Sequence, residues 1–120
     1  MFRLVNDTTI ELSKGDTGAI KITSYGHTFQ PEDRALFSIR DAAGTVVKQK
    51  IAELDENGAF VVYFYNKDTD SLAVGGSYSW DVRYVLHPYY NEKGDIVDGN
   101  QVITPVRPMG MNILSIVGDI

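Results

Sequence analysis

The sequence of 120 residues contains no cysteine and only two histidines. Without cysteine the chain cannot form a disulfide framework, a zinc site built on thiolates or a dithiol redox centre. A domain of this length buries roughly two-thirds of the surface that its unfolded chain exposes, so a hydrophobic core alone can stabilise it. We therefore expect a single domain that spans residues 1–120 and depends on packing.

Positive charge is also scarce, with 11 Lys and Arg against 16 Asp and Glu and a formal net charge of −5. The basic residues are scattered, whereas binding to nucleic-acid phosphates requires clustered positive charge, so we expect no nucleic-acid partner. No apolar run reaches transmembrane length, and the first residues lack the apolar stretch of a signal peptide. The sequence thus predicts no membrane insertion and no signal peptide.

Helical periodicity is almost absent, and apolar residues instead alternate with polar ones. Clusters of Gly, Asp and Asn interrupt the alternation about every 8–12 residues, which is typical of β-sandwiches and barrels. We expect an all-β fold, an antiparallel sandwich of seven or eight strands. The predicted strands lie near 8–12, 17–24, 34–40, 45–52, 59–65, 77–87, 101–106 and 109–117.

The stretch 77–87 is the clearest strand, because five bulky residues share one face with a period of two. These are Tyr78, Trp80, Val82, Tyr84 and Leu86. In 45–52 the same reasoning predicts Val47 and Ile51 inward, with Lys48 and Lys50 outward. Asn57-Gly58 predicts a type I′ turn. Residues 88–100 are expected to form a long loop, and residues 66–71 a single helical turn.

Residues 59–65 are apolar on both faces of the predicted strand. Phe60, Val62 and Phe64 share one face, while Tyr63 and Tyr65 lie on the other together with a valine. We expect the first face to join the core and the second to be covered by a neighbour or a partner. Tyr63 and Tyr65 are therefore candidate binding residues.

The run from Asp70 to Val82 resembles the corner before the penultimate strand of immunoglobulin-like domains. In that pattern a Leu caps the core, a Gly allows the turn, and a Tyr bonds back to the loop. The resemblance implies that Leu72 is the cap, that Tyr78 is the corner tyrosine and that Trp80 takes the core position where antibody-type domains have Cys.

The whole chain resembles small immunoglobulin-like proteins of phage and prophage tail modules, including the N-terminal domains of baseplate upper proteins. The matching segments are Ile10–Thr17, Ala35–Arg40, Leu72–Val82 and Met111–Val117. The resemblance implies an immunoglobulin-like sandwich and a non-enzymatic structural or adaptor role in a tail or baseplate. It also implies a virion component assembled in the bacterial cytoplasm, with other tail proteins or further copies of itself as partners.

Catalytic and metal-binding patterns are not found in the sequence. His27 falls in a loop and His87 on an outward face, so we interpret both as solvated or structural. Asn66–Asp70 has the alternating oxygen ligands of a calcium loop, but Ser71 and Ser77 replace the Gly and Glu that an EF-hand requires. We expect no catalytic residue, no cofactor and no metal.

Two other functions stay open. Tyr25 and Phe29 in one predicted loop, with His87, Tyr89 and Tyr90 in another, form a candidate aromatic binding surface for a protein or a host-surface glycan. The alternative is that these rings simply cover the end of the sandwich. A small β-sandwich hydrolase would instead require a histidine to meet carboxylates in a cleft.

Overall fold

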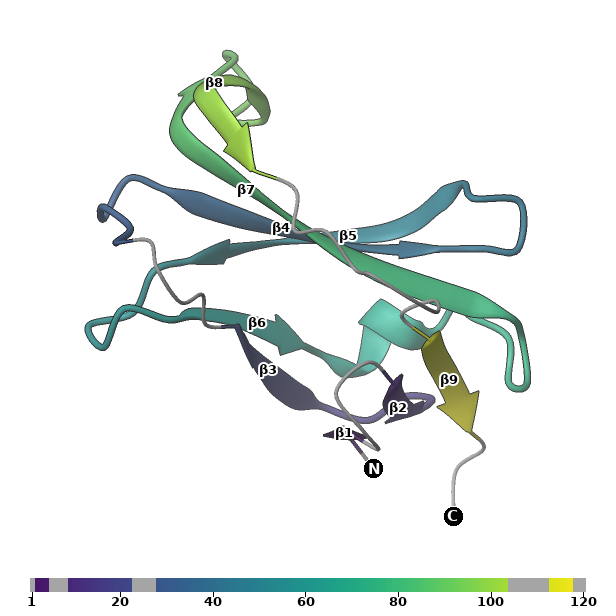
Figure 1. Ribbon diagram of the computed structural model, residues 1–120. Helices are drawn as coiled ribbons and strands as arrows, with labels where there is room; N and C mark the ends of the chain where they lie inside the picture. The colour runs from purple at the N-terminus through teal and green to yellow at the C-terminus, as the bar shows by residue number, and fades with distance from the viewer. Residues whose placement is uncertain (1, 5–8, 23–27, 104–112, 118–120) are drawn as a thin grey trace.

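The computed structural model describes residues 2–4, 9–22, 28–103 and 113–117, and the other residues are the grey trace in Figure 1. The described part of the chain forms strands and one short 3-10 helix, with no α-helix, so the all-β prediction is confirmed. The elements are β1 (Phe2–Leu4), β2 (Thr9–Ser13), β3 (Gly18–Ile22), β4 (Arg34–Arg40), β5 (Val46–Glu53), β6 (Phe60–Phe64), η1 (Asn66–Thr69), β7 (Tyr78–Tyr90), β8 (Ile96–Ile103) and β9 (Ile113–Val117).

The strands form a large sheet and a small one. The large sheet has the order β1-β2-β9-β7-β4-β5, and β8 also pairs with β7. The small sheet is the antiparallel pair β3-β6. Neighbouring strands are antiparallel except for β2 and β9, which run parallel. In Figure 1 the small sheet faces β4, β5 and β7. The core cluster draws its buried side chains from both sheets.

The predicted inward face of β7 is confirmed, because four of its five residues are buried and Tyr78 is half-buried. Trp80 stacks on Phe37 of β4 with ring centroids 5.6 Å apart. Phe37 in turn meets Phe64 of the small sheet edge to face, also at 5.6 Å. This aromatic stack joins the two sheets through the middle of the core.

The corner before β7 has the predicted contacts. The backbone N–H of Ala73 donates a hydrogen bond of 2.8 Å to the hydroxyl of Tyr78, and Leu72 is buried in the core. Gly76 is required here, because a Cβ at that position would lie 2.7 Å from the Tyr78 ring. The N–H of Gly75 donates to the carbonyl of Ile116, which ties the corner to β9.

The predicted orientation of β5 is wrong. Val47 and Ile51 are exposed, while Lys48 and Lys50 lie opposite Ile39 and Phe37 of β4 and so share their inward face. The inward placement is possible because both ammonium groups reach the buried carboxylate of Asp68. Their aliphatic stems cover the edge of the core while both ammonium groups share the one carboxylate of Asp68.

The type I′ turn predicted at Asn57-Gly58 is also wrong. Gly58 has a φ of 83°, but Asn57 does not have a positive φ, and the N–H of Gly58 donates to the carbonyl of Asp55. The carboxylate of Asp55 accepts the N–H groups of Asn57 and Ala59, which stabilises a type I turn followed by a left-handed glycine. The hairpins that begin at Asp41 and Asn91 repeat this pattern.

Gly58→Val should lower the free energy of unfolding by about 1–3 kcal/mol, because a β-branched residue resists a positive φ. No neighbouring atom lies within 4 Å of a Cβ built there, so the loss would come from the backbone alone. Thermal unfolding measures it. Gly58→Asn is the control and should lose less, because Asn tolerates the left-handed region. A valine variant as stable as the wild type would contradict this.

The long loop predicted at 88–100 is wrong as well, because β7 continues to Tyr90 and forms a hairpin with β8. Pairing between β7 and β4 ends at Val85, so beyond it β8 is the partner of β7 among the described strands. Pro88 is tolerated there because one edge of β7 needs no donor. β1 is not among the predicted strands, and part of the predicted strand 109–117 lies outside the described residues.

Candidate binding surface

Two of the predicted aromatic residues do not form an exposed patch. Tyr25 lies outside the described residues. Phe29 is half-buried, and its ring centroid lies 4.9 Å from those of Phe60 and Tyr84. Phe29 therefore packs on the core, and for this residue the expectation of an exposed binding ring is wrong. Phe29 is one of the partly buried residues that pack against the core cluster.

Tyr89 and Tyr90 are exposed, but they follow one another along β7. Consecutive residues of a strand point to opposite faces of the sheet. The two rings therefore do not present one shared platform on which a sugar ring could stack. This arrangement removes the main geometric support for the carbohydrate-binding alternative.

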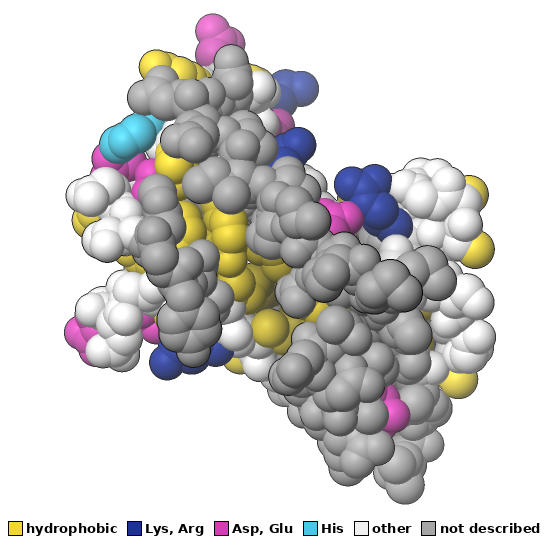
Figure 2. Space-filling view, viewed as in Figure 1, with side chains coloured by type: hydrophobic (Ala, Val, Ile, Leu, Met, Phe, Trp, Pro, Cys, Tyr) yellow, Lys and Arg dark blue, Asp and Glu magenta, His cyan; other side chains and the backbone are white. Residues whose placement is uncertain are grey.

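His87 lies at the surface beside two carboxylates. His87 has a φ of 51°. It lies within β7, but no residue of β8 is paired with it. Its Nδ1 lies 2.7 Å from Oε1 of Glu32, and its backbone N–H donates to Oδ1 of Asp33. Figure 2 shows a histidine (cyan) beside acidic side chains (magenta) on the surface. His27 lies outside the described residues.

Asp68 is the most strongly perturbed ionisable group among the described residues. Asp68 is 4% exposed, and burial alone would raise the pKa of its carboxyl group. Hydrogen bonds from the Tyr65 N–H and from the ammonium groups of Lys50 and Lys48 outweigh burial and lower the pKa to about 2. The helical turn predicted at 66–71 is present as η1. The carboxylate of Asp68 within it binds Lys48 and Lys50.

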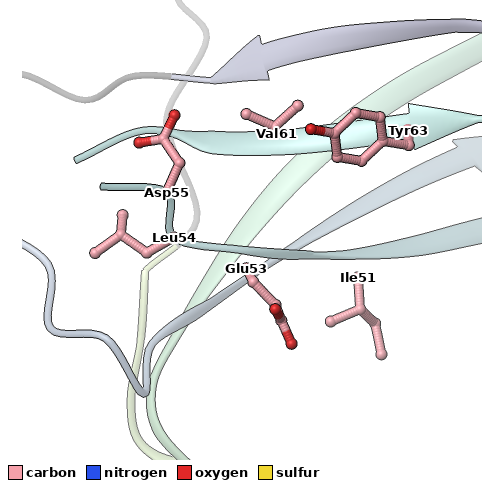
Figure 3. A pocket seen from close by; sticks show the side chains of 6 residues that line it. All are labelled: Ile51, Glu53, Leu54, Asp55, Val61 and Tyr63. Atoms are coloured by element: carbon pink, nitrogen blue, oxygen red, sulfur yellow. The ribbon is translucent and has the colours of Figure 1, made fainter. Parts of the chain in front are cut away.

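A groove opens between the edges of β5 and β6 on the outer side of the molecule. Its volume is about 480 Å³. Figure 3 shows that the lining comes from both strands and from the hairpin that joins them. The lining residues are Ile51, Glu53, Leu54, Asp55, Val61 and Tyr63. We call this set the β5–β6 groove.

Four of the six lining residues of the β5–β6 groove are apolar or aromatic, and Glu53 and Asp55 add two carboxylates. Ile51 is 50% exposed and Tyr63 is 56% exposed. Tyr65, the residue after β6, is also exposed, and the ammonium of Lys50 lies 5.3 Å from its ring centroid. The face predicted to be covered by a neighbour or a partner is thus not covered within the described structure.

Comparison with known protein families gives no match. Comparison with curated protein sequences gives none either. Among the described residues, no helix is long and apolar enough to cross a membrane. Because neither comparison gives a match, the β5–β6 groove has to be interpreted from its own residues.

Sequence reasoning found one wall of the groove and missed the other. Tyr63 was expected on an outer apolar face because residues 59–65 are apolar on both sides. Ile51 was assigned to the core because it alternates with lysines, and its exposure follows from the inward lysines of β5. The signal that could have found it is a buried acid elsewhere in the chain, but the pairing of Asp68 with Lys50 depends on the tertiary fold.

Proposed function

We propose that this protein is a non-enzymatic structural or adaptor component of a phage or prophage tail or baseplate. It has an immunoglobulin-like sandwich fold and assembles with copies of itself or with other tail proteins through the β5–β6 groove. The proposal combines the resemblance of the sequence with the surface that the fold leaves uncovered. The exposed apolar pair Ile51 and Tyr63, one on each sheet edge, is the observation that carries it.

Two features support the immunoglobulin-like assignment. In such domains consecutive strands are shared between two sheets, with the second and fifth in one and the third, sixth and seventh in the other. Counting from β2, the second and fifth strands, β3 and β6, form the small sheet, and the third, sixth and seventh, β4, β7 and β8, lie in the large one. The first and fourth strands, β2 and β5, also lie in the large sheet, which departs from the constant-type pattern. The hydrogen bond from Ala73 to Tyr78 supplies the tyrosine corner.

The edges of β5 and β6 differ in how they would meet a partner. β5 carries two inward lysines, a device that protects edge strands from pairing with another chain. All five residues of β6 are apolar, and the strand is paired along its length on one side, with β3. A partner strand or an apolar side chain would therefore find its contacts on the β6 side of the groove.

Size-exclusion chromatography with light scattering tests the assembly role. The wild-type protein should increase in mass with concentration, whereas Ile51→Ser combined with Tyr63→Ser should stay monomeric. Both side chains are at least half exposed, so the double variant should keep nearly the wild-type stability.

Tyr90→Ser is the matched control, because Tyr90 is a tyrosine of similar exposure that lies outside the groove. This variant should associate as the wild type does. A wild-type protein that stays monomeric at the highest reachable concentration and co-purifies with no tail protein would contradict the proposal.

A further inference from the structure

A histidine and two carboxylates meet at the start of β4, and none of the three lines the β5–β6 groove. Glu32 and Asp33 come from the turn before β4, and His87 comes from β7. One ligand atom from each of the three lies within 4.8 Å of the others. We propose that Glu32, Asp33 and His87 bind a divalent first-row transition-metal ion such as Zn²⁺.

The spacing suits a single ion. Zinc bound tetrahedrally at about 2.0–2.2 Å from each ligand separates its ligand atoms by roughly 3.3–3.6 Å. The three ligand atoms lie within 4.8 Å of one another, and rotation of the Glu32 and His87 side chains would bring them to this spacing. Both side chains are about half exposed, at 50% and 49%, so they are free to rotate and the ion can enter from solvent.

Asp33 supplies the fixed part of the site. Asp33 is 2% exposed. Its two carboxylate oxygens accept hydrogen bonds from the backbone N–H groups of His87 and Gln30, at 3.0 Å and 2.7 Å. An ionised carboxylate has about four lone-pair sites, so each oxygen keeps capacity for a metal ion. The same hydrogen bond fixes the backbone of His87 beside Asp33.

The donor set indicates the class of metal. Ca²⁺ and Mg²⁺ take oxygen ligands, whereas an imidazole nitrogen suits zinc, nickel, copper and iron. One imidazole and two carboxylates therefore favour a borderline ion such as Zn²⁺ over Ca²⁺ or Mg²⁺. Three protein ligands leave at least one position open for water or for a group from a partner.

Isothermal titration of the tag-free, chelator-treated protein with ZnCl₂ tests the site. We expect one Zn²⁺ per chain, a raised melting temperature with Zn²⁺, and no competition from equimolar Ca²⁺ or Mg²⁺. Glu32→Gln and His87→Gln should each weaken binding by at least about tenfold, since losing even an outer partner of a metal ligand typically costs 10–100-fold.

Asp70→Asn is the matched control, because Asp70 is an exposed carboxylate on the turn after η1 and outside the cluster. It should bind Zn²⁺ as the wild type does. Glu32 is half exposed, so its variant keeps the test valid if His87→Gln does not fold. The absence of Zn²⁺ binding, or equal binding by Glu32→Gln and the wild type, would show that the cluster is only an ion pair and would overturn the proposal.

Discussion

Trp80→Ala should lower the free energy of unfolding by about 3–5 kcal/mol, the usual cost of truncating a large aromatic residue in a core. Trp80 is 8% exposed and stacks on Phe37 with an angle of 15° between the ring planes. Its removal leaves a cavity in the aromatic stack that joins the large sheet to the small one. Guanidinium unfolding followed by circular dichroism measures the loss.

Tyr90→Ala is the comparison for Trp80→Ala, because it removes an aromatic side chain from the same strand at an exposed position. Surface substitutions of this kind usually change stability by about 0.5 kcal/mol or less. If the two variants had equal unfolding midpoints, Trp80 would not be a core residue and the assignment of the inward face of β7 would be wrong.

Asp68→Asn should destabilise the protein at neutral pH by about 2–4 kcal/mol. Breaking a buried ion pair usually costs about 3–5 kcal/mol, and the partial exposure of Lys48 and Lys50 places this site at the lower end. The variant keeps one acceptor oxygen but leaves two inward ammonium groups on β5 without their counter-charge.

The cost of Asp68→Asn should also depend on pH. The folded-state pKa of Asp68 is lowered from 3.8 to about 2, so its stabilising effect is present above pH 4 and is lost as the pH falls through 2. The difference corresponds to about 2 kcal/mol. Urea unfolding between pH 7 and pH 2 should therefore show the gap between wild type and variant narrowing by about this amount.

Asp70→Asn provides the control for the pH series, because it removes an exposed carboxylate two residues away. Its stability should follow the wild-type pH profile, including the titration of the chain's other acids. A gap between the wild type and Asp68→Asn that stays constant from pH 7 to pH 2 would show that the ionised carboxylate does not stabilise the fold.

The sequence predicted elements wherever one strand face is purely apolar. The β7 face that contains Trp80 and the β6 face that contains Phe64 were both assigned correctly, because burial of one face imposes a period of two. The same rule failed on β5, where valine and isoleucine alternate with lysine. Which set points inward there depends on Asp68, and its contact with Lys50 cannot be found from local pattern.

The candidate sites were harder to predict than the strands. Pro88 was interpreted as the start of a loop, although a proline is compatible with a strand that is paired on one side. That interpretation hid the juxtaposition of His87 with Asp33, which are 54 residues apart in the sequence. The β5–β6 groove likewise exists because two strands from different sheets lie next to each other, and no local spacing shows this.

Photo-crosslinking from position 63 tests the central claim most directly. The protein would carry p-benzoylphenylalanine in place of Tyr63, within the β5–β6 groove, or in place of Tyr90, outside it. In tail particles assembled with these variants, position 63 should crosslink to a second copy or to another tail protein, and position 90 should not. Particles that lack the protein, or crosslinks from position 90 and none from position 63, would contradict the proposed assembly role.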